Sequence, residues 1–271
     1  MDKTQYKQIV QNTFNTVATG YECEAMSFFN RSAALLPNIL QLSGDEQVLD
    51  VATGTGIAVA ALSPHLPEGK IIGIDFSKGM LAQAQKKVDE NKLLNVELKE
   101  MDMQSIEFPD NKFDVANCSF GIFFVEEMED ELAHIVQKVK PGGKVICCAF
   151  QESSFQPHID IFLDDIKPFG LEQPTFRWKN IGTEKSFKQF YQTSNLTDIQ
   201  IHRFNVGYYL KDEHVWWEVV WNAGFRGVIS SLSEEQLAAF KQTHLQNVRQ
   251  TADERGVYLN IDVLFALGIK T

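Results

Sequence analysis

The feature that most constrains the fold is the stretch at residues 48–59, which reads VLDVATGTGIAV. An apolar run ends in Asp50, gives way to small residues that include Gly54 and Gly56, and continues into an alanine- and valine-rich segment. This pattern predicts a buried strand, a tight turn and the first turn of a helix. Glycines in such a turn let the backbone approach a ligand closely at the binding edge of a sheet. We therefore expect a ligand at this turn, the alternative being an ordinary strand–turn–helix.

A second acid closes the next apolar run. Residues 71–74 are Ile-Ile-Gly-Ile, and Asp75 follows them directly. An acid at the end of the second strand is the position where two acceptor oxygens grip a ribose diol. The alternative for Asp75 is a simple helix cap.

Alternation of short apolar runs with helical patterns extends over residues 47–150. In the helical segments, Leu81, Ala84 and Val88 form one apolar stripe, and Ser77 stands before it as an N-cap. Such alternation implies a doubly wound α/β fold, with a mostly parallel sheet covered on both faces. Two further predicted strands after residue 150 bring the sheet to seven strands. The predicted strands are residues 47–52, 70–75, 95–100, 113–118, 143–149, 198–206 and 258–268.

The whole chain, residues 1–271, reads as one α/β domain with helical additions. Residues 1–44 are expected to form an N-terminal helical cover, and residues 45–150 the ligand-binding core. Residues 151–271 are expected to hold substrate-side additions and the last two strands. Within them a helical insertion, a lid over the substrate, spans about residues 207–256, and its second helix opens with a capping-box pattern from Ser233 to Gln236.

Bulk composition excludes several classes of function. The formal net charge is −11, and no run of Lys and Arg resembles a nucleic-acid footprint, so a small or neutral substrate is expected rather than DNA or RNA. The four cysteines lack metal-ligand spacing, so we expect no metal site but buried free thiols in a reducing cytoplasm. The N-terminus lacks a signal-peptide core, and no apolar run reaches the roughly 20 residues that span a bilayer.

Four ordered and correctly spaced segments resemble the class I S-adenosylmethionine-dependent methyltransferases. The likeness is to the branch of ubiquinone- and menaquinone-biosynthesis C-methyltransferases and their small-molecule relatives. It implies a Rossmann-like methyltransferase fold and S-adenosyl-L-methionine as cofactor. Ala52 stands where the family has a glycine, a change expected to cost little, and the last 120 or so residues do not resemble the quinone enzymes. The segments are residues 48–56, 71–81, 101–121 and 139–146, and residues 14–21 resemble the part that covers the cofactor.

The resemblance also implies which residues bind the cofactor. Asp50 would help to hold the amino group, Asp75 would accept both ribose hydroxyls, and Asp102 would accept from the adenine amino group. Asp102 as a turn residue and Tyr21 as a core aromatic remain the alternatives. The implied set is Asp50, Cys118, Ser119 and Phe120 at the methionine part, Ala52, Thr53, Gly54 and Gly56 in the turn under the cofactor, Asp75 at the ribose, Phe76, Met80, Asp102 and Met103 at the adenine, and Tyr21 closing over the methionine part.

Rival readings of the glycine-rich turn fit less well. The NAD(P) fingerprint needs G-x-G-x-x-G, and here Val59 or Ile57 stands at the last position. A protein-substrate methyltransferase is not favoured, because the fourth predicted strand is not followed by an N-P-P-Y-type tetrapeptide. A protein of this fold that binds S-adenosylmethionine without methylating, through other chemistry or as a regulator, remains the alternative function.

The acceptor is less constrained than the cofactor. Methyl transfer from a sulfonium is an in-line displacement that depends mainly on proximity, and a base is needed only if the acceptor must lose a proton. His158 and His214 are weak candidates for such a base, whereas His244 is expected in a core. Aromatic residues in the additions predict a flat or apolar acceptor, although packing of helices explains Trp217 and Trp221 equally well. These aromatics are Phe155, Phe162, Phe169, Phe176, Trp178, Phe187, Phe190, Tyr191, Tyr208, Tyr209, Trp216, Trp217, Trp221 and Phe225.

Overall fold

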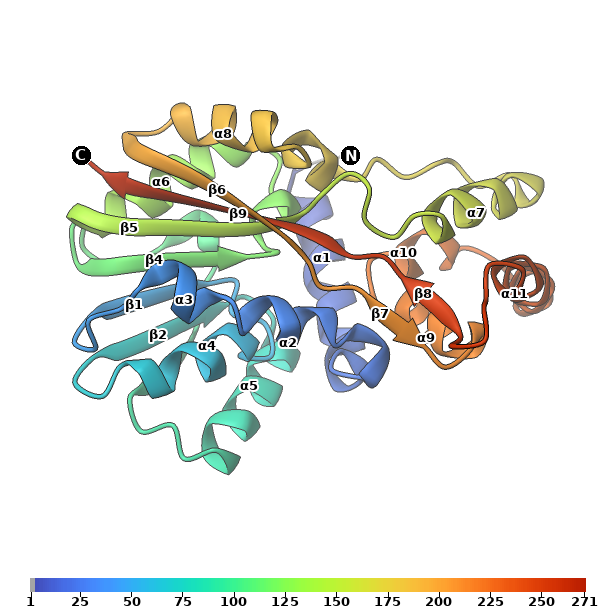
Figure 1. Ribbon diagram of the computed structural model, residues 1–271, viewed down its shortest axis with the longest axis horizontal. Helices are drawn as coiled ribbons and strands as arrows, with labels where there is room; N and C mark the ends of the chain where they lie inside the picture. The colour runs from blue at the N-terminus through green and yellow to red at the C-terminus, as the bar shows by residue number, and fades with distance from the viewer. Residues whose placement is uncertain (1–2) are drawn as a thin grey trace.

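A seven-stranded sheet forms the centre of the computed structural model, which describes residues 3–271 (Figure 1). The strand order is β3-β2-β1-β4-β5-β9-β6. Strands β1 to β5 run parallel, and β9 runs antiparallel to both of its neighbours. The predicted mostly parallel, doubly wound sheet is thus confirmed. The strands are β1 (Gln47–Val51), β2 (Lys70–Asp75), β3 (Val96–Glu100), β4 (Phe113–Ser119), β5 (Val139–Phe150), β6 (Leu196–Asn205) and β9 (Asp262–Lys270).

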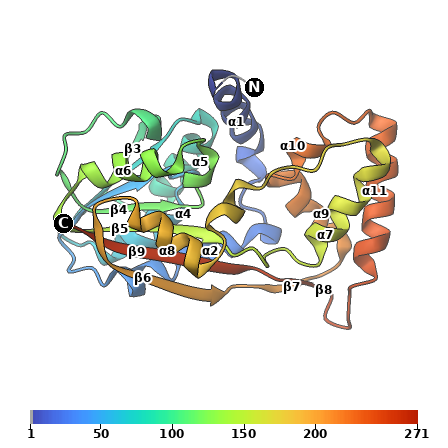
Figure 2. The same cartoon turned by 90° about the horizontal axis from the view of Figure 1, so that it is seen from above.

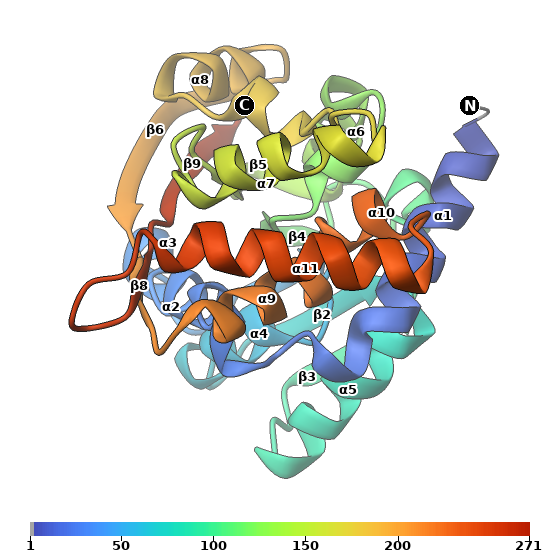
Figure 3. The ribbon, with the colours of Figure 1, turned by 90° about the vertical axis from the view of Figure 1, so that its right-hand side faces the viewer.

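Helices cover both faces of the sheet because the strand order reverses direction at β1. Right-handed crossovers place α4 (Ile57–Leu62) and α5 (Lys78–Glu90) on one face. They place α6 (Met128–Lys138) and α8 (Glu184–Gln192) on the other face (Figure 3). As predicted, the Ser77 hydroxyl caps α5 by accepting from the Met80 N–H at 3.2 Å. The reversal leaves a crevice beyond the carboxyl ends of β1 and β4, where ligands bind in folds of this kind.

The N-terminal segment is helical, as expected for residues 1–44, of which residues 1–2 lie outside the described part. It comprises α1 (Lys3–Val17), two 3-10 turns at Ala18–Gly20 and Glu24–Met26, α2 (Phe28–Ala33) and α3 (Leu36–Leu40). Helix α1 lies against the start of α5, and an ideal Cβ on Gly79 would stand 3.0 Å from the Asn15 carbonyl oxygen. A glycine at position 79 therefore allows this close approach.

The C-terminal additions gather beyond the carboxyl ends of the strands (Figures 1 and 2). Their helices are α7 (His158–Asp165), α9 (Glu213–Asn222), α10 (Arg226–Ile229) and α11 (Glu234–Arg249), with 3-10 turns at Lys167–Phe169 and Arg177–Ile181. The predicted capping box at α11 is present, since Ser233 and Gln236 bond reciprocally. Helices α7, α9 and α11 pack on one another. Among residues 3–271, no helix combines the length and apolarity that crossing a bilayer requires.

Two boundaries of the predicted C-terminal elements are wrong. The insertion at about residues 207–256 is not wholly helical, and the last predicted strand, residues 258–268, is interrupted. Strand β7 (Tyr208–Leu210) instead pairs with β8 (Val257–Leu259) in a separate two-stranded sheet. This ribbon continues the β6–β9 pair beyond the main sheet, and the Val206 N–H still donates to the Ile261 carbonyl. A strand of three residues carries too little periodicity for its partner to be foreseen.

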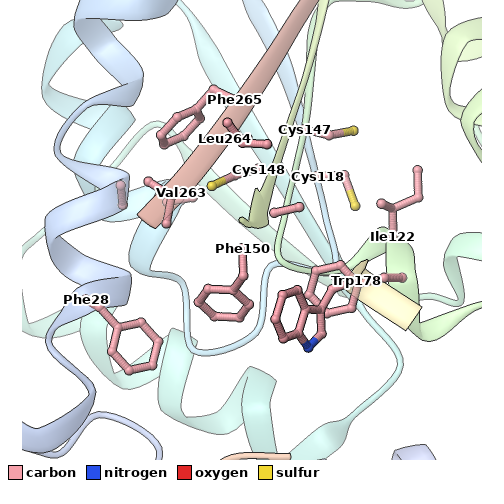
Figure 4. Close-up of a cluster of buried hydrophobic side chains, with 14 of the residues drawn as sticks. Phe28, Cys118, Ile122, Cys147, Cys148, Phe150, Trp178, Val263, Leu264 and Phe265 are labelled. Carbon is pink, nitrogen blue, oxygen red and sulfur yellow. The ribbon is translucent and has the colours of Figure 1, made fainter. Parts of the chain in front are cut away.

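An aromatic cluster lies where the sheet meets the additions (Figure 4). Phe150, at the end of β5, contacts Phe28, Phe155 and Trp178 with ring centroids 4.9–5.8 Å apart. In β5 the Cys147 and Cys148 side chains point to opposite faces, as predicted. All four cysteines are free thiols, and three are buried, while Cys23 is half-buried. The additions are thus joined to the sheet by a continuous hydrophobic core.

Candidate functional site

The glycine-rich turn after β1 has a left-handed backbone at three positions. The φ angles are 53° at Ala52, 56° at Gly54 and 77° at Gly56. The Thr53 N–H donates to the Ile74 carbonyl at 2.9 Å, which holds the turn against the end of β2. An ideal Cβ on Gly54 would have no heavy atom within 4 Å, so this glycine faces open space. The turn therefore presents bare backbone to the crevice.

Alanine at position 52 is not as harmless as the sequence suggested. A left-handed conformation costs an L-residue with a Cβ roughly 1–2 kcal/mol. The Ala52 side chain also excludes one at the neighbouring position, since a Cβ on Gly121 would stand 2.7 Å from the Ala52 Cβ. The methyl group at position 52 is accommodated because position 121, after β4, is a glycine.

The Asp75 carboxylate lies at the end of β2 and is held by the backbone. One oxygen accepts from the Gly54 N–H at 2.9 Å, and the other accepts from the Ser77 N–H at 2.8 Å. Burial raises the pKa of Asp75, although these backbone bonds oppose the shift. An ionised carboxylate has about four lone-pair sites, so both oxygens keep acceptor capacity. Asp75 is therefore oriented and can accept further hydrogen bonds from a ligand.

Asp50 lies in a buried polar network between neighbouring strands. It is the register partner of Asn117 on β4, and the Asn117 amide donates to its carboxylate at 2.6 Å. The Thr53 hydroxyl donates to the other oxygen, and the Ser119 hydroxyl donates to Asn117 at 2.9 Å. Burial raises the pKa of Asp50 to about 6, with the Asp75 charge adding to the shift and the two hydrogen bonds opposing it. The carboxylate thus titrates near neutral pH.

One pocket brings most of the predicted site residues together. Two residues of the expected set do not line it. Gly56 packs against α5, where its Cβ would lie 3.2 Å from the Ala84 Cβ, and Cys118 is buried in the core. Cys118 is excluded because alternate strand side chains face opposite sides, and Asn117 and Ser119 share the other side. The predicted residues that line the pocket are Tyr21, Asp50, Ala52, Thr53, Gly54, Asp75, Phe76, Met80, Asp102, Met103, Ser119 and Phe120.

Helix α1 supplies a wall of the pocket, which agrees with the helical cover predicted for residues 1–44, but the contacts that hold it there were not predicted. Lys7 pairs with Asp102, and the Gln11 amide donates to the Phe76 carbonyl at 2.6 Å. Asn15 accepts from the Ser77 hydroxyl and from the Gly79 N–H. The apolar side of α1 marked by Phe14 was the available signal. Lining residues missed by the sequence analysis are Tyr6, Lys7, Val10, Phe14, Phe29, Ala33, Thr55, Ile57, Ala58, Met101, Gln104, Gly121, Phe124, Val125, Glu126 and Glu127.

The aromatic residues of the additions do not line this pocket. Trp216, Phe162 and Phe240 are instead buried, and Trp217 stacks on Trp221 at 6.1 Å between centroids. The packing alternative was therefore the better reading of these residues. The helices of the additions bury their apolar faces against one another. Their aromatic rings are therefore part of a core and do not face the pocket. The aromatic rings at the pocket come from the N-terminal segment and from the loops after β2 and β4.

Neither candidate base lies at the pocket. His158 is buried in the additions, where its Nε2 is 3.0 Å from the Thr251 hydroxyl, and His214 is exposed at the start of α9. His244 is buried, as expected for a core residue. Its Nε2 accepts from the Trp216 indole at 2.8 Å, and its Nδ1 bonds Asp165 at 2.8 Å. Among the described residues, the lining of the pocket contains no histidine.

Comparisons with known proteins agree with this geometry. A family model described as a methyltransferase domain matches residues 48–143. The demethylmenaquinone methyltransferase of Geobacillus sp. (strain WCH70) is 41% identical over 103 residues, which are 38% of this chain and 44% of that relative. The enzyme of the same name from Bacillus cereus (strain B4264) is 29% identical over 183 residues, 62% of this chain and 77% of its own. The first match therefore spans less than half of the relative.

A solved structure supports the fold over almost the whole chain. Phosphoethanolamine N-methyltransferase 2 of Haemonchus contortus, in complex with S-adenosyl-L-methionine, superimposes with a TM-score of 0.56. It is 16% identical and covers 94% of this chain and 57% of that one. Residues 48–143 thus match a methyltransferase domain, the chain is similar to demethylmenaquinone methyltransferases, and it shares the fold of a methyltransferase solved with S-adenosyl-L-methionine.

Proposed function

We propose that this enzyme methylates a small, flat, apolar or aromatic molecule. The observation that carries the proposal is the ring of aromatic side chains at the pocket. Phe29 contacts the rings of Tyr21 and Phe120, and Phe14 contacts those of Tyr21 and Phe124. Aromatic walls favour a flat apolar ligand, because its burial gains area and ring stacking.

The charges of the pocket support the same choice. Lys7 is the one cation among its described lining residues, and it is already paired with Asp102. A carboxylate or phosphate acceptor would therefore find no unpaired cation among these lining residues. We infer that a neutral or cationic acceptor fits this site and an anionic one does not.

We further propose that the cofactor lies along the ends of β1, β2 and β3. Asp75 would accept the ribose hydroxyls with its remaining lone pairs, and the open space beside Gly54 would take the cofactor backbone. Asp50 would face the amino group, and Asp102 with the Met103 N–H would face the adenine. Ala52, Thr53, Ser119 and Phe120 would border the methionine part, Phe76 and Met80 would flank the adenine, and Tyr21 would close over the cofactor.

Catalysis at this site follows mainly from positioning. When bound, S-adenosyl-L-methionine supplies an activated methyl group on a cationic sulfur. The buried Asp50 network and the fixed Asp75 carboxylate would orient the cofactor, and α1, which lines the pocket, would help to cover it. Holding two reactants in line can supply roughly 7–11 kcal/mol of barrier reduction. No base in the lining is needed for an acceptor that is nucleophilic without losing a proton.

We propose that residues 1–271 form one domain. The division is the N-terminal cover at 1–44, the core at 45–150 and the additions at 151–271. Buried residues of all three parts, such as Phe28, Leu49 and Trp216, belong to one contiguous hydrophobic cluster. A chain whose parts share a core is expected to unfold in one cooperative transition.

The test of the proposed function is transfer of a labelled methyl group to a matched panel of acceptors. The panel should contain naphthoquinols, as suggested by the names of the relatives, simple phenols, aromatic amines and small anionic or aliphatic acids. We expect labelled product with flat aromatic acceptors and none with the acids. Asp75→Ala, assayed at a cofactor concentration that just saturates the wild type, serves as the control with weakened cofactor binding. Methylation of the aliphatic acids alone would contradict the proposal, and S-adenosylmethionine binding without transfer to any member would favour the non-methylating alternative.

A further inference from the structure

Three aromatic rings in mutual contact form a continuous wall of the pocket. The rings of Tyr21 and Phe29 stack with centroids 5.1 Å apart at 18°. Phe120 meets Phe29 edge to face, at 5.1 Å and 77°. All three side chains line the pocket and are half-buried, so part of each ring is available to a ligand. We call Tyr21, Phe29 and Phe120 the aromatic box.

Phe120, one member of the aromatic box, has a strained backbone conformation. Its φ is 56°, a left-handed conformation that a bulky residue seldom adopts. The Phe120 N–H donates to the Cys148 carbonyl at 2.8 Å, which holds this conformation at the end of β4. Glycine would adopt this conformation without strain, but the glycine of this segment, Gly121, stands one position later. Strain of this kind is typical of positions where a side chain has a binding role.

The surroundings of the box favour a positive charge. Five carboxylates line the pocket; Asp102 pairs with Lys7, the cation among its described lining residues, and Glu126 pairs with Arg177. The Asp75 carboxylate lies close enough to Tyr21 to influence it electrostatically. Aromatic faces attract cations through their quadrupole, and the attraction grows where water is excluded. An aromatic wall between buried acids is thus suited to a cation that carries little hydration. The five acids are Asp50, Asp75, Asp102, Glu126 and Glu127.

We propose that the aromatic box binds the sulfonium centre of S-adenosyl-L-methionine and makes the site distinguish this cofactor from its neutral product. The inference rests on the proposed placement of the cofactor, in which the sulfur lies between Asp75 at the ribose and Asp50 at the amino group. In the reaction the carbon–sulfur bond breaks as the bond to the acceptor forms, and the electron pair stays on sulfur. The sulfonium thereby becomes the neutral thioether of S-adenosylhomocysteine, which has lost the charge that the rings attract. The box would therefore favour exchange of product for fresh cofactor.

The experiment measures dissociation constants for S-adenosylmethionine and S-adenosylhomocysteine by calorimetry in wild type, Tyr21→Leu, Phe29→Leu and Phe120→Leu. Leucine keeps an apolar side chain but removes the π face. We expect each substitution to lower the preference for the sulfonium, expressed as the ratio of the two constants, by about threefold to tenfold. Tyr21→Phe is the matched control, because it keeps the ring and should leave the ratio as in wild type.

The outcomes distinguish failure of the aromatic-box proposal from failure of the proposed function. Equal losses of affinity for both ligands in the leucine variants would overturn the box and leave the cofactor site standing. Failure of the wild-type chain to bind either ligand would overturn the cofactor placement and, with it, the box. Tyr21 and Phe29 lack the left-handed backbone of Phe120, so their variants carry the test if Phe120→Leu does not fold, which its circular dichroism would reveal.

Discussion

The core at residues 45–150 and the additions at residues 151–271 use their polar and aromatic residues in opposite ways. In the core, Asp50 and Asp75 lie at strand ends and keep hydrogen-bonding capacity toward a pocket. In the additions, His244 and Trp216 satisfy each other inside a buried network. Position relative to the sheet decides between these uses, because the carboxyl ends of parallel strands meet at one open edge. An aromatic-rich segment near a ligand site therefore does not by itself provide the walls of that site.

The largest expected effect tests whether the additions are purely structural. His244→Ala should remove about 3 kcal/mol from the free energy of unfolding, because it leaves the Asp165 carboxylate and the Trp216 indole without their buried partner. Urea unfolding measures this loss. The affinity for S-adenosylmethionine should stay at its wild-type value in calorimetry. A folded variant with weakened cofactor binding would contradict the comparison between core and additions. The hydrogen-bond network around His244 would then influence the pocket.

The next effect tests the core. Asp75→Ala should weaken S-adenosylmethionine binding by about 2 kcal/mol or more, roughly 30-fold, through loss of charge-assisted hydrogen bonds. It also frees the Gly54 and Ser77 N–H groups, so a thermal melt must accompany the calorimetry. Asp89→Ala, at an exposed position of α5, is the matched control. Unchanged affinity would remove Asp75 from the site.

The pH dependence of binding probes Asp50. Its pKa is raised from 3.8 to about 6 by burial, so the folded protein holds this proton more tightly than the unfolded chain. The resulting stability is fully present below pH 3.8 and is lost as pH rises through about 6. The affinity for S-adenosylmethionine depends on pH in the opposite direction, because contact with the cofactor ammonium requires the ionised form of Asp50. We expect affinity for S-adenosylmethionine to fall about tenfold from pH 7 to pH 5 in wild type. It should vary little in Asp50→Asn, and an equal fall in both would assign the titration to another group.

The smallest effect sharpens the role of α1 as the cover. In Gly79→Ala the added methyl group would stand 3.0 Å from the Asn15 carbonyl oxygen and 3.2 Å from the Ala18 Cβ, so α1 must shift. A cost of about 1 kcal/mol on its docking should speed dissociation of S-adenosylmethionine about fivefold in stopped-flow measurements. Gly227→Ala, where a Cβ meets open space, is the control. Equal rates in the two variants would show that α1 does not gate the pocket.

Local pattern was sufficient for the parts of the site that a single strand–turn–helix unit builds. The run from Asp50 to Gly56 and the acid at Asp75 were predicted because strand ends and glycine turns are written in a few consecutive residues. Local pattern was not sufficient for Cys118, which was predicted at the site but is buried in the core. The strand was correctly located, but which alternate side chains face the crevice depends on the register of β4 against β1.

What the sequence by itself determined is the doubly wound sheet, the glycine-rich turn and the acids at the edge of the sheet. Tertiary structure alone decided that Lys7 of the predicted cover pairs with Asp102, that Tyr21, Phe29 and Phe120 form one aromatic wall of the pocket, and that the aromatics of the additions are buried elsewhere. Hydrogen-bonding geometry at a turn is local. The partner of an aromatic ring is chosen by packing between segments distant in sequence, which periodicity within one segment does not encode.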